Sequence, residues 1–223
     1  GDPAGALQAY QQALRLDREL FEAHFNLGCL WLDQSKPDAA RNEFTACTLR
    51  QPNAADAWLK LGAVQTRLGE FVAAEASLQR TLRLNATNPE ARNALGLLCA
   101  QRKRPHEAVQ HFTAALKLQA NYRPALLNLA TVLNRDLNDP AGAAKRYREY
   151  LALQPRDGDW ESVNGLLRSI EQRLQPTPRP PATNASLAAA PVTPPAPKAS
   201  NPVVAVPSAP RSNPPPVVST PAP

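Results

Sequence analysis

Large and small apolar residues follow a pattern that recurs every 34 residues over the first part of the chain. One series joins a leucine to a small residue and comprises Leu27-Gly28, Leu61-Gly62, Leu95-Gly96 and Leu129-Ala130. A second series sets an alanine four residues before a larger side chain: Ala40 and Phe44, Ala74 and Leu78, Ala108 and Phe112, then Ala143 and Tyr147 one residue late. Apolar residues three and four apart are typical of one helix face. The pattern predicts two helices, A and B, in each unit, each of about 14 residues or ~21 Å.

The small residues of both series predict where helix A and helix B of one unit approach each other. Glycine or alanine at these positions lets the backbones come close, and the large residues beside them fill the remaining space. Enlarging Ala74 to leucine should therefore overpack the contact and cost about 1–3 kcal/mol. The predicted packing residues are Leu27, Gly28, Ala40, Leu61, Gly62, Ala74, Leu95, Gly96, Ala108, Leu129, Ala130 and Ala143.

Prolines and short polar residues predict the starts of the B helices. Pro37, Pro105 and Pro140 stand where these helices would begin, and proline suits the first helical turn. Ser35 and Asp139 lie just before such prolines and are expected near the helix caps. The extra residue of the last unit falls near this turn, where an insertion disturbs packing least.

The spacing of these residues resembles the tetratricopeptide repeat, whose pattern is W-x2-L-G-x2-Y, then A-x3-F, then P. The first full unit reads His24-x2-Leu27-Gly28-x2-Trp31, then Ala40-x3-Phe44, then Pro52. The departures are Gln65 and Cys99 in the second aromatic position, and Ala86 and Ala120 in place of the closing proline. The resemblance implies an all-α fold, an α–α superhelix (solenoid) whose concave face is lined by the A helices.

The units divide the chain into successive segments. We expect the second half of a truncated repeat at 1–20, because Ala6 and Tyr10 keep the register of the B-helix series. We expect a capping helix at 158–175, because apolar residues recur there at helical spacing: Trp160, Val163, Leu167, Ile170 and Leu174. Trp160 is expected to anchor that helix. Full repeats are expected at 21–54, 55–88, 89–122 and 123–157. Because the chain contains no methionine, Gly1 is not expected to be a translation start, and we expect a fragment of a longer chain.

The last segment, 176–223, has a different composition. It holds 16 of the 24 prolines and contains no glycine, no aromatic residue and no acidic residue. Such a composition cannot build a core, so we expect a disordered Pro/Ala-rich tail. Its PxxP spacings match those that SH3-type grooves read, but proline is so frequent here that a linker is the favoured interpretation over a docking motif.

Charge and candidate chemistry exclude several functions. Lys plus Arg is 25 and Asp plus Glu is 19, with the two signs interspersed, so the basic stripe of a nucleic-acid-binding protein is missing. No apolar run is long enough to span a membrane. His24, His106 and His111 form no metal motif, and no phosphate loop or nucleophile elbow is present. We therefore expect no enzyme activity and no cofactor.

The three cysteines, Cys29, Cys47 and Cys99, are an odd number at wide spacing and form no obvious disulfide framework. Cys47 and Cys99 are interpreted as small core residues, whereas Cys29 could face the groove. The sequence does not decide between the cytoplasm and a bacterial periplasm as the compartment of the protein. A bacterial origin is an impression from the Ala-, Arg- and Leu-rich composition, and the oligomeric state is undetermined.

The resemblance implies a protein-interaction scaffold that holds a protein or an extended peptide in the concave groove. Candidate groove residues, taken by register, are Phe25, Asn26, Leu59, Lys60, Asn93, Leu97, Leu127, Asn128 and Thr131. Relatives linked to sugar-transferase scaffolds use asparagines here to hold a peptide backbone, since an amide both donates and accepts. The alternative is that these residues are ordinary solvated or inter-repeat packing positions.

Two further interpretations concern the partner and the whole protein. Glu22, Asp56 and Glu90 would repel a carboxylate, so a carboxylate clamp for a peptide C-terminus is rejected. The alternative function is a non-catalytic repeat region of a larger bacterial enzyme, such as a sugar-transferase-like protein, or of a cell-envelope assembly protein.

Overall fold

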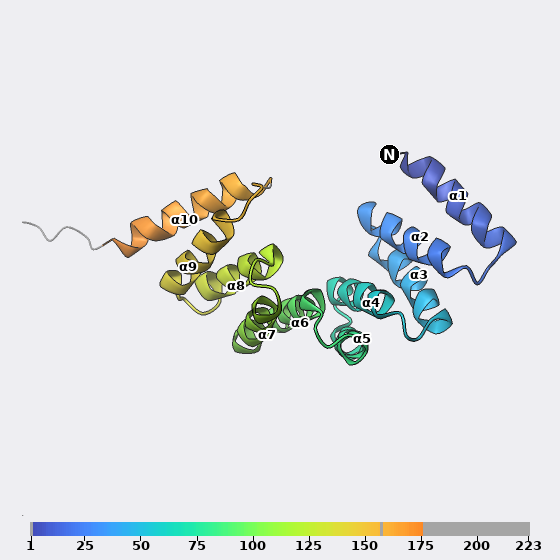
Figure 1. Ribbon diagram of the computed structural model, residues 1–223, viewed down its shortest axis with the longest axis horizontal. Helices are drawn as coiled ribbons and strands as arrows, with labels where there is room; N and C mark the ends of the chain where they lie inside the picture. Colours follow the sequence, from blue (N-terminus) through green and yellow to red (C-terminus); the bar gives the residue numbers. More distant parts are fainter. Residues whose placement is uncertain (1, 157, 176–223) are drawn as a thin grey trace, which may run out of the picture. The chain divides into compact units, whose positions relative to one another are not determined.

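The computed structural model describes residues 2–156 and 158–175, and over these residues the chain is all-α (Figure 1). The helices are α1 (Pro3–Leu16), α2 (Phe21–Asp33), α3 (Pro37–Arg50), α4 (Ala55–Leu68), α5 (Phe71–Leu84), α6 (Pro89–Gln101), α7 (Pro105–Leu118), α8 (Arg123–Arg135), α9 (Pro140–Leu151) and α10 (Trp160–Leu174). The predicted tail, 176–223, lies outside the described residues.

Successive helices pack as pairs, and the pairs follow one another as a superhelix. The A helices are α2, α4, α6 and α8, and each packs against the B helix that follows it, namely α3, α5, α7 or α9. We call these the first to the fourth helix pair. The B helices α3, α5 and α7 also contact the next A helix, α9 contacts α10, and α4 contacts α6 as α6 contacts α8. The A helices therefore lie in sequence along one side, as Figure 1 shows.

The contact between the two helices of a pair depends on the small residues. A Cβ added at Gly62 would lie 2.7 Å from Leu78 Cγ and 3.2 Å from the Ala74 carbonyl oxygen. One added at Gly96 would lie 2.5 Å from the Phe112 ring. These distances leave no room for a methyl group unless the neighbouring side chain moves. All twelve predicted packing residues are buried: Leu27, Gly28, Ala40, Leu61, Gly62, Ala74, Leu95, Gly96, Ala108, Leu129, Ala130 and Ala143.

The turn inside each pair contains one residue with left-handed backbone geometry. Gly69 has φ 78°, and its counterparts Ser35, Lys103 and Asn138 have φ 57°, 60° and 50°. The expectation that Ser35 caps α3 is therefore wrong, because Ser35 supplies this turn conformation and no side chain caps α3. Asp139 does cap α9, since its Oδ1 accepts a hydrogen bond of 2.8 Å from the Gly142 N–H. Pro37, Pro105 and Pro140 are the first residues of their helices.

The two ends of the array differ. The last helix, α10, buries Val163, Leu167 and Ile170 against α9, whereas Leu174 in its last turn remains 44% exposed. Trp160 is half-buried and its Nε1–H donates to the Leu151 carbonyl oxygen over 3.2 Å. At the other end, α1 packs on α2 without any fully buried residue.

None of the helices in the described part of the chain is long and apolar enough to cross a membrane.

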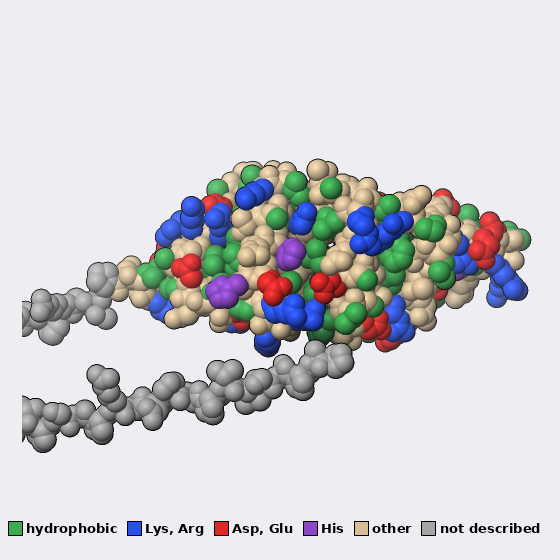
Figure 2. Space-filling view, turned by 90° about the horizontal axis from the view of Figure 1, so that it is seen from below, with side chains coloured by type: hydrophobic (Ala, Val, Ile, Leu, Met, Phe, Trp, Pro, Cys, Tyr) green, Lys and Arg blue, Asp and Glu red, His purple; other side chains and the backbone are tan. Residues whose placement is uncertain are grey.

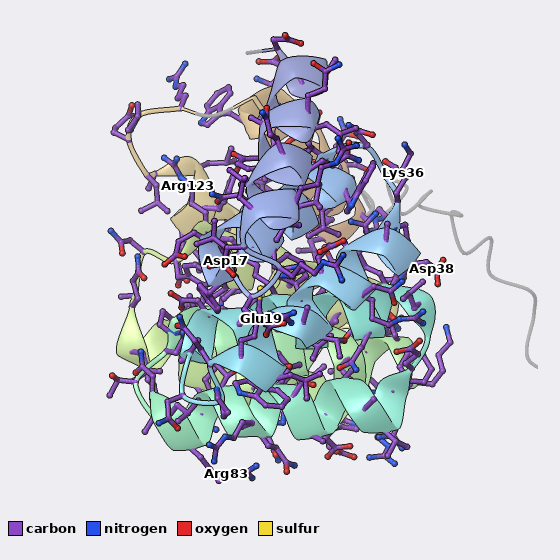
Figure 3. The ribbon with its side chains drawn as sticks, turned by 90° about the vertical axis from the view of Figure 1, so that its right-hand side faces the viewer. Asp17, Glu19, Lys36, Asp38, Arg83 and Arg123 are labelled. Carbon is purple, nitrogen blue, oxygen red and sulfur yellow. The ribbon has the colours of Figure 1, made fainter. Side chains whose placement is uncertain are left out.

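The turn between α1 and α2 is held by contacts from α3. Figure 3 shows Asp17 and Glu19 in this turn. Arg50 of α3 lies 2.9 Å from Glu19 and donates to the Arg18 carbonyl oxygen over 3.0 Å. A backbone carbonyl of this turn is thus bound by a side chain of the next pair, an arrangement that recurs elsewhere in the array.

Candidate binding surface on the A helices

The candidate groove residues lie on the A helices and differ in accessibility. Asn26 on α2 is exposed, and Leu97 on α6 is 38% exposed. Lys60, Leu127, Asn128 and Thr131 are half-buried. We use the name A-helix face for the surface formed by Phe25, Asn26, Lys60, Leu97, Leu127, Asn128 and Thr131.

Leu59 does not belong to this surface. Its side chain is only 3% exposed and lies in the core shared by α4, α5, α6 and α7. Phe25 lies at the edge of the surface: its ring meets the Phe44 ring edge-on at 5.7 Å and stacks on Phe21 at 5.9 Å. Both side chains therefore contribute to packing, and only Phe25 keeps an accessible part.

Two of the three candidate asparagines bind each other. Asn128 Nδ2 donates to Asn93 Oδ1 over 2.9 Å, which links α8 to α6. Asn93 is only 6% exposed, so its amide has little access to a ligand. This pair stabilises the contact between neighbouring A helices. Of the three amides, Asn26 is the one that is exposed.

Carboxylates lie in the first turns of three successive A helices, at Glu22, Asp56 and Glu90, and all three are exposed. Negative charge is favourable at a helix N-terminus, which accounts for their position. Lys60 lies 3.2 Å from Glu90 and links α4 to α6. The first two carboxylates give this edge of the A-helix face an acidic character.

A hollow of about 230 Å³ opens beside the acidic residues where α2 meets the turn before α4. Its lining residues are Phe21, Phe25, Gln51, Ala54, Ala55 and Asp56. The repeat register predicted Phe25 as a groove residue but did not predict Phe21. The spacing of four residues between the two phenylalanines, which places them on the same side of a helix, could have indicated it. An apolar wall with one carboxylate at its rim can take a side chain that is apolar along its length and cationic at its tip.

The thiols are not set up for reaction. Cys47 is fully buried, and burial raises the pKa of its thiol to about 12. Burial also raises the pKa of Cys99 and of the half-buried Cys29. Since the thiolate is the reactive form, a raised pKa lowers its fraction at neutral pH.

Two of the three histidines, His24 and His111, are partly buried among other side chains. His24 Nδ1 lies 2.6 Å from Glu43 Oε2, and its Nε2 lies 3.0 Å from the Arg18 carbonyl oxygen. Burial, followed by the charge of Arg92, lowers the pKa of His111. Within residues 2–156 and 158–175, no group of three or more His, Cys, Asp or Glu residues could hold a metal ion.

Charged side chains of both signs lie interspersed on the face that Figure 2 shows. Several of them link neighbouring helices, for example Arg102 with Glu75 at 3.0 Å and Arg41 with Glu70.

Family models match more than half of the chain. The model described as "Tetratricopeptide repeat" matches residues 28–89 and 67–124, and the model described as "TPR repeat" matches residues 1–39. The chain belongs to the tetratricopeptide-repeat (TPR) family. Proteins built from this repeat are generally non-catalytic scaffolds for protein interaction.

Similar proteins include one curated human protein and several solved structures. The Homo sapiens protein O-mannosyl-transferase TMTC3 is 29% identical over 137 residues, which are 60% of this chain and 15% of that protein. The structure of TTC0263, a thermophilic TPR protein of Thermus thermophilus, has a TM-score of 0.64 and 18% identity, covering 76% of this chain and 91% of that one. The structure of YrrB, described as a TPR protein with an unusual peptide-binding site, has a TM-score of 0.55 and 22% identity, covering 73% and 84%.

Proposed function

We propose that the A-helix face binds an extended segment of a protein partner. The observation that carries this proposal is the hollow between Phe21, Phe25 and Asp56. The exposed Asn26 follows Phe25 on the same helix. The hollow would take one anchoring side chain, and the amide can both donate to and accept from the backbone of a peptide. The peptide-binding site described for YrrB supports the same use of this fold.

Charge restricts the proposed partner. Exposed Glu22 and Asp56 favour a segment with Lys or Arg and disfavour a peptide C-terminal carboxylate. In this proposal Asn93 and Asn128 do not contact the partner; they bind each other and link α6 to α8. They hold α6 and α8 in place, while Leu97 of α6 offers an exposed apolar contact.

The test uses peptides selected from a random library against the full chain. We expect selected peptides to carry a basic residue, and the variants Asn26→Ala and Leu97→Ser to weaken their binding by about tenfold or more in a titration. Val72→Ser is the matched control, because Val72 is 80% exposed on α5, a B helix. If the A-helix variants bind as tightly as the unaltered chain, or if Val72→Ser weakens binding equally, the proposal is wrong.

A second candidate is a non-catalytic repeat region of a larger enzyme or cell-envelope protein. The match to 15% of protein O-mannosyl-transferase TMTC3 favours it, since in that relative the similar residues are a small part of a long protein. Sequencing the full gene decides this: a catalytic or membrane-spanning segment would support it, and a gene encoding only further repeats would remove it.

A further inference from the structure

A second hollow, of about 530 Å³, shares no lining residue with the A-helix face. It is formed where the C-terminal ends of α7 and α9 meet the turn before α8. The residues that line it are Leu116, Ala120, Asn121, Leu126, Arg146, Glu149, Ala152 and Leu153. We call it the Leu126 hollow. Its volume falls in the range of pockets that bind small ligands or single side chains.

The same set of positions exists around the turn between α3 and α4. Four of these positions hold larger side chains there, at Pro52, Trp58, Arg80 and Arg83, and two hold smaller ones, at Thr48 and Ser77. The eight counterparts lie 68 or 69 residues earlier and are Thr48, Pro52, Asn53, Trp58, Ser77, Arg80, Arg83 and Leu84. There, Trp58 replaces Leu126 and its Nε1–H donates to the Pro52 carbonyl oxygen over 2.9 Å. Arg80 also reaches this carbonyl, at 3.3 Å. In the second pair, an indole ring and its hydrogen bond therefore occupy the position.

The first and third pairs show the same preference for a long, nitrogen-bearing side chain. In the first pair the counterpart is His24, whose Nε2 lies 3.0 Å from the carbonyl oxygen of Arg18, six residues earlier. In the third pair it is Arg92. The interval from Trp58 to Pro52 is also six residues. A side-chain nitrogen thus meets the carbonyl of the preceding turn in two of the four pairs.

In the fourth pair the corresponding position is Leu126, which has no side-chain nitrogen and does not fill the space that Trp58 fills in the second pair. Leu126 is 1% exposed, so it forms the floor of the hollow and offers no donor to the Ala120 carbonyl. Alanine replaces both Pro52 and Arg83, at Ala120 and Ala152. Arg146 and Glu149 form a 2.7 Å ion pair at the rim. Because the carboxylate of Glu149 is already paired with Arg146, the hollow offers no unpaired carboxylate to a guanidinium such as that of Arg92, whereas an uncharged ring needs none.

We propose that the Leu126 hollow binds the indole ring of a tryptophan side chain carried by a partner protein. The ring lies on Leu126 and Leu116, and its N–H donates to the Ala120 carbonyl oxygen, as Trp58 does to Pro52 within the chain. Indole fits this site because it joins a large apolar surface to one donor. This site is separate from the A-helix face, so it does not depend on the peptide binding proposed above.

The experiment titrates N-acetyl-L-tryptophanamide, up to its solubility limit, into the ¹⁵N-labelled full chain and follows backbone amide signals by NMR. We expect the largest shifts at Asn121, Leu126, Glu149 and Ala152. The 1-methylindole analogue, which has lost the N–H, should bind about threefold to tenfold more weakly. Absence of shifts at these residues, or an equal response to N-acetyl-L-leucinamide, would overturn the proposal.

Two substitutions test the site directly. Leu126→Trp supplies the ring from within the chain and should abolish the shifts while the spectrum stays that of a folded protein. Ala152→Arg restores the counterpart of Arg83 at an exposed position, and it tests the same point should Leu126→Trp fail to fold. Undiminished binding to a folded form of either variant would show that the ring binds elsewhere. Trp58→Leu is the reciprocal variant and should create a second set of shifts near Pro52 and Arg80.

Discussion

The second and fourth helix pairs share the contact between their two helices but differ at the edge of the pair. Inside each pair, a small residue on the A helix faces a large buried one on the B helix: Gly62 faces Leu78, and Ala130 is the counterpart of Gly62 as Tyr147 is of Leu78. At the edge, Trp58 and Pro52 give way to Leu126 and Ala120. The contact between helices thus permits only small changes in volume, whereas the edge accepts changes that open a hollow.

Removing the large B-helix residue should give the greatest loss of stability in either pair. Leu78 is fully buried, and Leu78→Ala should cost about 2–5 kcal/mol. Tyr147, 3% exposed, should cost about 3–5 kcal/mol when changed to alanine. Urea unfolding followed by circular dichroism measures both. A loss below about 1 kcal/mol in only one pair would show that the two interiors are not equivalent.

The small A-helix residue provides a matched pair of substitutions. Gly62→Ala would gain about 1 kcal/mol in helix propensity but would bring a methyl group to 2.7 Å from Leu78 Cγ. Overpacking costs about 1–3 kcal/mol, so we expect a net loss of stability. Ala130→Gly, the reverse change in the fourth pair, should cost about 1 kcal/mol through propensity. A higher melting temperature for Gly62→Ala would contradict the tight contact.

The links between neighbouring A helices should differ along the array. Asn128→Ala removes the partner of the 6% exposed Asn93 and should cost about 1–2 kcal/mol, since a buried amide loses a hydrogen bond. Lys60→Ala, which breaks the half-exposed pair with Glu90, should cost less than about 1 kcal/mol and should matter less at high salt. If both variants lose the same unfolding free energy, and neither loss changes with salt, the Asn128–Asn93 and Lys60–Glu90 links are equivalent.

The turns inside the pairs should give the smallest effects. Gly69→Ala places a Cβ at φ 78° and should cost about 1 kcal/mol. Asn138, at φ 50°, already tolerates the left-handed region, so Asn138→Gly should change stability by less than about 0.5 kcal/mol. A neutral result for Gly69→Ala would show that the second turn relaxes away from this geometry.

The helices and their internal contacts could be predicted from the residue pattern. The spacing of Leu61-Gly62 and Ala74 indicates which residues face each other, because two helix backbones can approach closely only where the side chains between them are small. Pro37, Pro105 and Pro140 mark helix starts for a local reason, the fixed φ of proline. Such features depend on a few neighbouring residues and so can be read along the chain.

The candidate surface could be predicted only in part. Register placed Asn93 and Asn128 on neighbouring A helices, but whether their amides meet depends on the spacing of α6 and α8, and they bind each other at 2.9 Å. Leu59 is buried for the same kind of reason, since it packs in a core formed by residues of several helices. Ser35 resembles a cap in sequence, yet it has left-handed backbone geometry in the turn between α2 and α3, with φ 57°.

The sequence by itself determined the repeat, the helix pairs, and the small residues at which the helices touch, because these follow from a period of 34 residues and from side-chain volume. Only the tertiary structure decided which of the repeated positions remain accessible. Whether Trp58 fills its position while Leu126 leaves a hollow, and whether an asparagine faces solvent or another asparagine, depends on distances between helices that no single unit contains.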